Sequence, residues 1–298
     1  MTVYPTSLLP PLFPTLVPLE PFLDESALQQ EFRDLPSVPV LWQVQSIDST
    51  NRCLLEWAPQ GLPQHFCLVA RQQSAGRGRR GRAWISDAEG SLTFSLWWIF
   101  DRSLQELSGL PLAVSLGMVE ALHSLGMTSV GVKWPNDLWR EGRKVAGVLV
   151  ETTRLSSGQV GAVIGIGLNI ALPSSLQDTC VLSLNDLRDE AGQAPARATV
   201  LGRLLNTLIP LLESFAQSGF APFAETWMTH CVHRNQQVTL LHPNHTRSQG
   251  ECVGLSSLGG LILRDPAGEP HTYHGGRTVP AFGGSLTCGC TSIWVTAN

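Results

Sequence analysis

The segment Arg71-Gln-Gln-Ser-Ala-Gly-Arg-Gly-Arg-Arg-Gly-Arg-Ala-Trp84 separates two apolar stretches of the chain. Arginine and glycine nearly alternate from Gly76 to Arg82. This run cannot form a core, because several guanidinium groups lie among residues without side chains. Glycine lets a backbone approach a ligand closely, and arginine offers a planar set of donors suited to carboxylate and phosphate. The segment therefore predicts a mobile loop that closes over an anionic small molecule.

The apolar stretches on both sides of the loop predict buried strands, His65–Ala70 before it and Ser91–Phe100 after it. The loop is therefore expected to be anchored in the core of a sheet. Further strands are predicted over Leu41–Ile47 and Val160–Ile170, with an antiparallel meander over Val130–Thr152. Helices are predicted over Arg52–Trp57, Leu110–Leu125, Ala194–Ser218 and Phe220–His230.

The two ends of the chain differ from this middle part. Residues 1–40 are rich in proline, which disfavours long helices and sheet ladders. They predict an extension that is draped over the domain or disordered, with a short helix near Asp24–Asp34 capped by Asp24 and a partner-binding segment as the alternative. From Gln236 onward, short strands alternating with turns predict a small β-barrel. We therefore divide the chain into an extension (1–40), a main domain (41–232), a barrel domain (233–282) and a tail (283–298).

Composition excludes several classes of protein. The chain has 298 residues, of which 43% are apolar and 15% charged, as expected for a globular protein with a large core. Its net charge of −4 argues against binding nucleic acid by bulk electrostatics. The 7 cysteines are scattered, which favours reduced thiols in a cytosol. No stretch is apolar for long enough to span a membrane, and the N-terminus does not resemble a signal peptide.

Polar residues that follow the predicted strands are candidates for chemistry. Ser49-Thr-Asn51 either caps a helix or also holds a polar ligand with its hydroxyls and amides. Lys133 and Lys144 are either solvated at strand ends or face a polyanion such as a nucleotide triphosphate. Asn136 and Asp137 offer oxygen atoms to Mg²⁺. No P-loop motif is present, and no G-x-G-x-x-G sequence opens a helix after a strand. These residues predict a nucleotide or acyl-phosphate site, without identifying the substrate.

Several segments together suggest a family. They are Asp48-Ser-Thr-Asn51, Gln73-Ser-Ala-Gly-Arg-Gly-Arg-Arg-Gly-Arg-Ala-Trp84, Lys133-Trp-Pro-Asn-Asp137, Lys144-Val-Ala-Gly-Val-Leu-Val-Glu151 and Gly165-Ile-Gly-Leu-Asn169. Their order and spacing resemble the biotin protein ligase family, over roughly Leu41–Thr278. The resemblance implies an α+β fold, in which a mixed β-sheet flanked by helices, of the class II synthetase-like type, precedes a small SH3-like β-barrel.

The resemblance also implies a reaction and roles for residues. ATP and biotin, with Mg²⁺, form biotinyl-5′-AMP and pyrophosphate, and a lysine of a biotin carboxyl carrier protein, an acetyl-CoA carboxylase subunit, then takes the biotinyl group. The main domain at 41–232 would be the biotin- and ATP-binding catalytic domain. The implied catalytic residues are Lys144 and Arg79. The implied biotin-binding residues are Ser49, Thr50, Asn51, Gln73, Arg77, Gly78, Arg79 and Lys144. The implied ATP- or adenylate-binding residues are Arg77, Arg79, Arg82, Trp84, Lys133, Asn136 and Asn169, with Asn136 and Asp137 near the metal.

One departure from the family and several alternatives remain. Bifunctional members carry an N-terminal winged helix-turn-helix, whereas the segment before residue 41 is short and proline-rich, so a monofunctional ligase that binds no nucleic acid and no membrane is expected. The alternatives are a lipoate or octanoate protein ligase or transferase of the same superfamily, and a biotin-responsive regulator. A cytoplasmic location is expected, and a homodimer is left open. The loop is expected to be disordered without ligand and ordered over biotin or the adenylate.

Overall fold

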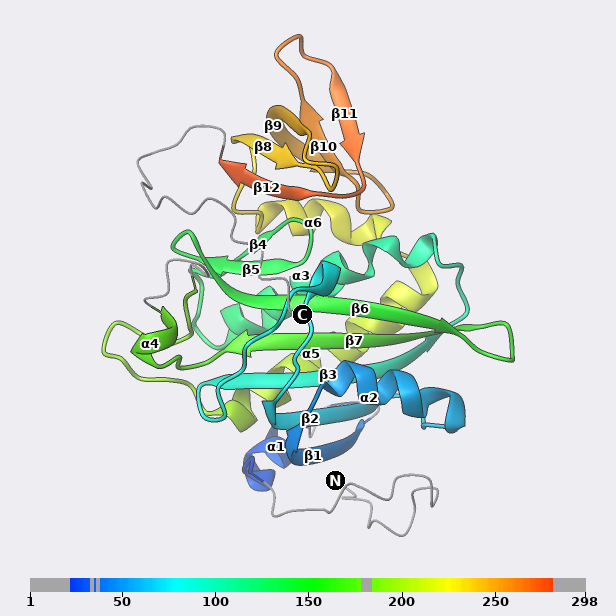
Figure 1. Cartoon of the computed structure of the whole chain (residues 1–298), viewed down its shortest axis with the longest axis vertical. Coiled ribbons are helices and arrows are strands. Elements are labelled where there is room, and N and C mark those ends of the chain that lie inside the picture. Colours follow the sequence, from blue (N-terminus) through cyan, green and yellow to red (C-terminus); the bar gives the residue numbers. More distant parts are fainter. Residues whose placement is uncertain (1–21, 33–34, 36–37, 178–183, 281–298) are drawn as a thin grey trace, which may run out of the picture.

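A seven-stranded sheet forms the centre of the molecule, in the order β1-β2-β3-β7-β6-β5-β4 (Figure 1). The computed structural model describes residues 22–32, 35, 38–177 and 184–280. β1 and β2 are parallel and the other neighbouring strands are antiparallel, so the sheet is mixed, as the resemblance implied. The strands are β1 (Val40–Ile47), β2 (Phe66–Gln73), β3 (Ser91–Phe100), β4 (Gly131–Lys133), β5 (Asp137–Arg140), β6 (Arg143–Arg154) and β7 (Val160–Asn169).

Helices cover both faces of this sheet. On one face, α3 (Leu110–Ser124) and α5 (Arg197–Ser218) pack against each other and enclose the larger core. On the other face lies α2 (Thr50–Trp57), over a smaller apolar cluster. Side chains alternate along β3, so Phe94 joins the larger core and Trp97 the smaller one. The buried polar residue Ser95 consequently lies on the α2 face.

Most predicted elements are confirmed, and β3 has the predicted bounds. α5 begins at Arg197 instead of Ala194. Ala194 precedes Pro195, and a residue before proline is disfavoured in the helical conformation, while Ala196 is extended. The helix predicted over Phe220–His230 is divided into a 3-10 turn (Ala221–Phe223) and α6 (Ala224–Thr229). A four-residue helix, α4 (Ser174–Gln177), follows β7.

The described part of the predicted extension packs against the sheet domain. α1 (Glu25–Glu31) starts after Asp24, whose carboxylate accepts hydrogen bonds from the N–H groups of Ser26 and Ala27, as the capping prediction required. Leu28 is fully buried in the larger core, and Glu31 forms an ion pair with Arg203 of α5. The core of the sheet domain therefore already begins before residue 41. The first part of the extension and the tail at 283–298 lie outside the described residues.

A second, five-stranded antiparallel sheet follows, in the order β11-β10-β9-β8-β12, and corresponds to the predicted barrel domain. Its strands are β8 (Gln237–Leu241), β9 (Arg247–Leu255), β10 (Leu261–Arg264), β11 (Pro270–Tyr273) and β12 (Arg277–Pro280). Trp134 Nε1 donates a hydrogen bond to the Gly259 carbonyl oxygen (3.1 Å), which joins this sheet to the first domain. Within the described residues, no helix is both long and apolar enough to cross a bilayer.

Candidate active site

The beginning of α2 places the Ser49-Thr-Asn51 segment against β3 and β6. Ser49 is the N-cap residue, and its hydroxyl accepts a hydrogen bond from the Arg52 N–H. The side chains of Ser49, Thr50 and Asn51 are all buried. The capping interpretation is therefore confirmed, and burial beside the sheet also makes these polar side chains available to an internal cavity.

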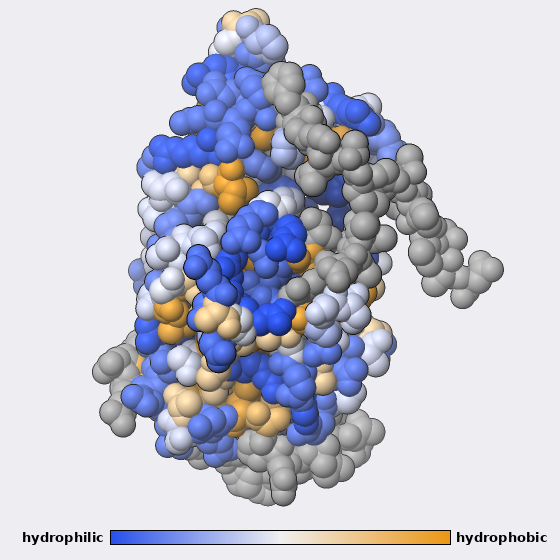
Figure 2. All heavy atoms as spheres, turned by 90° about the vertical axis from the view of Figure 1, so that its left-hand side faces the viewer, coloured by the Kyte–Doolittle hydropathy of each residue, from blue (hydrophilic) through white to orange (hydrophobic). Residues whose placement is uncertain are grey.

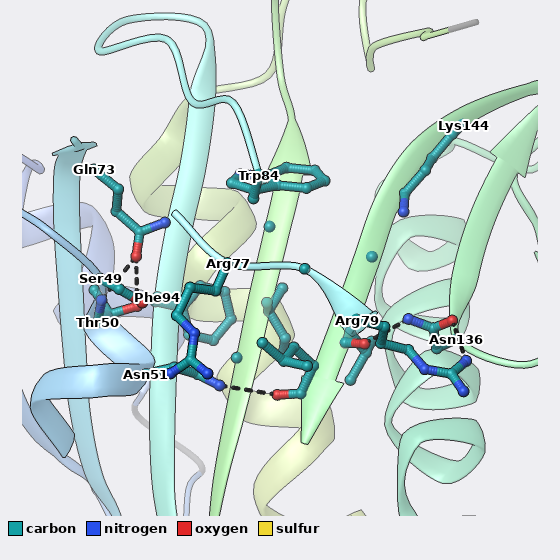
Figure 3. Close-up of a pocket in the computed structure, with 17 residues that line it drawn as sticks. Ser49, Thr50, Asn51, Gln73, Arg77, Arg79, Trp84, Phe94, Asn136 and Lys144 are labelled. Carbon is teal, nitrogen blue, oxygen red and sulfur yellow. Dashed lines mark hydrogen bonds between the residues drawn. The ribbon is translucent and has the colours of Figure 1, made fainter. Parts of the chain in front are cut away.

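A chain of hydrogen bonds links this segment to the neighbouring strands (Figure 3). The Thr50 N–H and hydroxyl donate to Gln73 Oε1 (2.8 and 3.0 Å), and the Thr50 hydroxyl lies 2.7 Å from Ser95 Oγ. Ser95 Oγ donates to Asn51 Oδ1 (2.6 Å), and Asn51 Nδ2 donates to Glu151 Oε2 (3.0 Å). Each of these side chains is oriented by its neighbour. We call the set the polar wall, and its hydrogen bonds already form before a ligand binds. Its members are Thr50, Asn51, Gln73, Ser95 and Glu151.

Glycines in the sheet make room for the site. A Cβ atom at Gly165 would overlap the Asn51 amide, and one at Gly167 would overlap the Trp84 indole. At Gly147, which pairs with Gly167, a Cβ atom would lie 2.9 Å from Lys144 Nζ. Glycines at these positions of β6 and β7 therefore allow side chains to approach the sheet closely.

The basic loop forms a tight hairpin that passes in front of the sheet (Figure 1). The Trp84 N–H donates to the Gly76 carbonyl (2.8 Å), and the Gly78 N–H donates to the Arg82 carbonyl (2.6 Å). Arg80 and Gly81 turn the chain at its tip with positive φ angles of 59° and 73°. Glycine suits the second of these positions and explains part of the alternating pattern.

The loop arginines point towards different partners. Arg77 Nη2 pairs with Glu151 Oε1 (3.0 Å), the carboxylate that also holds Asn51. Arg79 Nη1 donates to Asn136 Oδ1 (2.9 Å) (Figure 3). Burial lowers the pKa of Arg79, and the neighbouring Arg80 adds to this effect, but a guanidinium remains charged at physiological pH.

Two cavities meet at Arg79 and Lys144. The smaller cavity is bounded by the polar wall, Arg77 and the sheet glycines, and the larger encloses about 340 Å³ and extends towards the barrel. Lys144 Nζ pairs with Asp137 Oδ1 (2.6 Å) and lies 5.7 Å from the centre of the Trp84 ring. The residues common to both cavities are Gly78, Arg79, Trp84, Asn136 and Lys144. The positive charges of Arg79 and Lys144 therefore lie at the junction of the two cavities, where the two parts of a ligand that fills both cavities would be linked.

The larger cavity contains the remaining predicted nucleotide residues. Arg82, Lys133 and Asn169 line it. Asn169 is buried, and its Nδ2 donates to the Asn185 carbonyl oxygen (3.1 Å). Lys133 is only 4% exposed, and its Nζ lies 3.6 Å from the centre of the Trp139 ring. Burial lowers the pKa of Lys133 to about 8. All predicted site residues thus line one of the two adjoining cavities.

The two predicted metal ligands, Asn136 and Asp137, each contact a cationic side chain. Asn136 Oδ1 already accepts from Arg79, and Asp137 Oδ1 already accepts from Lys144. Among the described residues, no cluster of three or more His, Cys, Asp or Glu side chains could hold a metal ion. A metal role for Asn136 and Asp137 therefore stays a prediction, and in this structure the two residues hold Arg79 and Lys144 by hydrogen bonds.

The structure adds residues that the sequence interpretation missed. Ser95 and Glu151 complete the polar wall, and Arg80 and Arg277 line the larger cavity. Ser95 had a recognisable signal, because polar residues occupy every second position at the start of β3, at Ser91, Thr93 and Ser95. Arg277 had none, because it comes from the barrel and only the fold brings it to the site.

Comparison with known proteins agrees with this geometry. The model of the biotin/lipoate A/B protein ligase family matches residues 43–169. The bifunctional ligase/repressor BirA of Escherichia coli (strain K12) is 38% identical over 217 residues, which cover 73% of this chain and 67% of that protein. The biotin--[acetyl-CoA-carboxylase] ligase of Paracoccus denitrificans is 31% identical over 232 residues, which cover 74% of this chain and 93% of that protein.

The chain belongs to the biotin/lipoate A/B protein ligase family. Among solved structures, the biotin protein ligase from Aquifex aeolicus in complex with biotin and ATP is similar, with a TM-score of 0.66 and 30% identity. The similarity covers 80% of this chain and 97% of that one, so it includes both the mixed sheet and the C-terminal sheet. The family fold implied by the sequence is therefore confirmed.

Proposed function

We propose that this chain is an ATP-dependent biotin protein ligase. It activates biotin as biotinyl-5′-AMP and transfers the biotinyl group to a lysine of a biotin carboxyl carrier protein, the acetyl-CoA carboxylase subunit. The proposal rests above all on one observation, that a polar cavity and a cation-rich cavity meet at Arg79 and Lys144. Relatives named as biotin ligases support biotin over the lipoate or octanoate alternatives within the same family.

In the first step, a carboxylate oxygen of biotin attacks the α-phosphorus of ATP. The bond between that phosphorus and the bridging oxygen to the β-phosphate breaks, and pyrophosphate leaves with the electron pair. Lys144 and Arg79 offset the repulsion between the two anions and stabilise charge that develops in the transition state. Asp137 and Asn136 orient these cations before the substrate binds.

In the second step, the ε-amine of the carrier lysine attacks the acyl carbon, AMP leaves, and the amine loses a proton. The basic loop shields the mixed anhydride from water until that attack. We assign biotin to Ser49, Thr50, Asn51, Gln73, Arg77 and Gly78. We assign the nucleotide to Arg82, Trp84, Lys133, Asn136 and Asn169. Asn136 and Asp137, which line the larger cavity, would offer oxygen atoms to a Mg²⁺ ion bound with ATP, and that ion would neutralise part of the phosphate charge.

Three further expectations belong to the same proposal. The chain acts in the cytoplasm, as its scattered cysteines suggest. We expect it to bind no nucleic acid, because its net charge is −4 and most of the described cations without an ion pair line one cavity. A homodimer is compatible with this function, and sedimentation with and without biotin and ATP measures it.

The decisive assay incubates the purified chain with ATP, Mg²⁺, biotin and a carrier domain. We expect pyrophosphate release and a carrier whose mass rises by one biotinyl group. A carrier with its acceptor lysine replaced by arginine is the matched control and should gain no mass. Activity with lipoate or octanoate in place of biotin, and none with biotin, would overturn the assignment.

A further inference from the structure

The polar wall ends in a carboxylate that contacts two different elements. One oxygen of Glu151 in β6 accepts a hydrogen bond from Asn51 Nδ2 (3.0 Å), and the other pairs with Arg77 Nη2 of the basic loop (3.0 Å). Asn51 Nδ2 also donates to the Leu149 carbonyl oxygen (3.2 Å). An ionised carboxylate and a carbonyl oxygen only accept hydrogen bonds. The Asn51 amide therefore has one orientation, in which its Oδ1 atom faces Ser95.

This orientation sets the direction of the other hydrogen bonds in the wall. Ser95 has a single hydroxyl proton, and it donates that proton to Asn51 Oδ1 (2.6 Å). Towards Thr50 Oγ1, which lies 2.7 Å away, Ser95 Oγ is then an acceptor. The Thr50 hydroxyl proton is shared between Ser95 Oγ and Gln73 Oε1 (3.0 Å), both of which accept. The hydroxyl protons of Ser95 and Thr50 are therefore used inside the wall.

The smaller cavity is consequently offered a defined set of donors and acceptors. Gln73 Oε1 is the atom that Thr50 holds, so the amide protons of Gln73 are on the nitrogen that points away from Thr50 (Figure 3). The Thr50 hydroxyl oxygen keeps a lone pair, and both residues line the cavity. A head group that suits them has a carbonyl oxygen beside an N–H, as a cyclic urea has. An octanoyl or lipoyl chain has neither at its end, and each buried group left unpaired would cost about 1–3 kcal/mol.

We propose that Glu151 is a positioning residue that determines which head group the smaller cavity accepts. This inference rests on the proposed function. Glu151 is not among the described residues that line the two cavities, so it acts through Asn51 and Arg77, which do line the smaller one. Through Asn51 it fixes the direction of the hydrogen bonds in the polar wall, and through Arg77 it holds the basic loop over the same cavity. The ring urea of biotin meets the donors and acceptors that result.

Kinetics and ligand binding of Glu151→Gln test this role. Glutamine has the same size, but it has no charge and brings N–H donors towards Asn51 and Arg77. Loss of a hydrogen bond to a charged group predicts an increase of about tenfold to a hundredfold in the KM for biotin. The KM for ATP should stay near the wild-type value. Dethiobiotin keeps the ring urea and should lose affinity by the same factor as biotin, whereas the binding of octanoate, which has no urea, should not change.

Two further variants complete the test. Glu151→Asp keeps the carboxylate and should recover part of the biotin affinity. The matched control is Glu31→Gln, which removes a partly buried carboxylate that pairs with Arg203 outside both cavities. It should change neither the KM for biotin nor the KM for ATP.

The possible failures of the two proposals can be told apart. An active wild-type enzyme whose Glu151→Gln variant keeps its KM for biotin, or loses biotin and octanoate by the same factor, would overturn the positioning role and leave the proposed function intact. If the wild-type chain made no biotinyl-5′-AMP, the proposed function would fail instead. Calorimetric binding of dethiobiotin to the wild type and to Glu151→Gln would then still decide on Glu151, since equal affinities, or no binding to either, would exclude its role.

Discussion

Replacing Lys133 with methionine should make the protein more stable at neutral pH. Burial lowers the pKa of Lys133 from 10.5 to about 8, with Arg277 and Lys144 adding to the shift and Asp137 opposing it. At about 1.4 kcal/mol for each pKa unit, the folded state is destabilised by roughly 3 kcal/mol while the lysine is charged. Methionine keeps an apolar contact with Trp139 but loses a cation–π contact worth about 1 kcal/mol. The expected net gain in the free energy of unfolding is ~2 kcal/mol.

The pH dependence distinguishes this cause from better packing. Below pH 8 the lysine is protonated in both the folded and the unfolded chain, so the penalty is fully present. Between about 8 and 10.5 the folded chain has lost this proton and the unfolded chain keeps it, so wild-type stability rises relative to the variant. The advantage of Lys133→Met should therefore be largest at pH 7 and mostly lost at pH 10.

Urea unfolding followed by tryptophan fluorescence at pH 7 and pH 10 measures both quantities. Arg154→Met is the matched control, because it removes an exposed, unpaired cation of β6 and should change stability by less than about 0.5 kcal/mol at either pH. A gain that is equal at the two pH values, or a variant less stable than the wild type at pH 7, would refute the electrostatic reasoning. The variant should also use ATP less efficiently, in line with the phosphate role proposed for Lys133.

Three other substitutions test the assigned roles. Lys144→Ala should slow adenylate formation by a factor of about 10² to 10³, since it removes a cation at the reacting centre, and pyrophosphate release at the wild-type rate would contradict this role. Arg79→Gly should still form biotinyl-5′-AMP but release it at least about tenfold faster, because the loop loses its contact with Asn136; unchanged retention of the intermediate on a filter would speak against it. Gly165→Ala should raise the KM for biotin by about tenfold, because the new Cβ displaces the Asn51 amide, and a KM equal to that of the wild type would exclude Asn51 from biotin binding.

Local patterns predicted the sheet domain well because its elements are signalled over short stretches. The run Ser91–Phe100 has a strand's composition and length, and Glu141 and Gly142 have the positive φ angles expected of the turn between β5 and β6. β12 (Arg277–Pro280) has only a weak sequence signal, because four residues after two glycines carry little periodicity. β12 pairs with β8, with Thr278 opposite Leu240 and Val279 opposite Thr239, and this pairing exists only once the barrel has formed.

The composition of the site was predictable, but its connections were not. Ser49-Thr-Asn51 was recognisable as a polar segment at a helix start, whereas its bond from Asn51 to Glu151 joins residues that are 100 positions apart. The sequence also could not show that Asn136 accepts a hydrogen bond from Arg79 and that Asp137 accepts one from Lys144. An amide and a carboxylate suit a metal as well as they suit a cationic side chain. The fold shows that both residues contact a cationic side chain, and their metal role stays a prediction.

The charge distribution explains how a chain of net charge −4 can still offer a strongly positive cavity. Several of the described carboxylates outside this cavity pair with arginines, as Glu225 does with Arg234. Hydrophilic side chains dominate the barrel at the top of the face shown in Figure 2. In the cavity between barrel and sheet, the single carboxylate among the described lining residues is Asp137, and it pairs with Lys144. The other cations repel one another in the free protein, which opposes folding and favours the binding of a polyanion. The gain in stability predicted for Lys133→Met is therefore the result expected if this cavity is built to bind a polyanion.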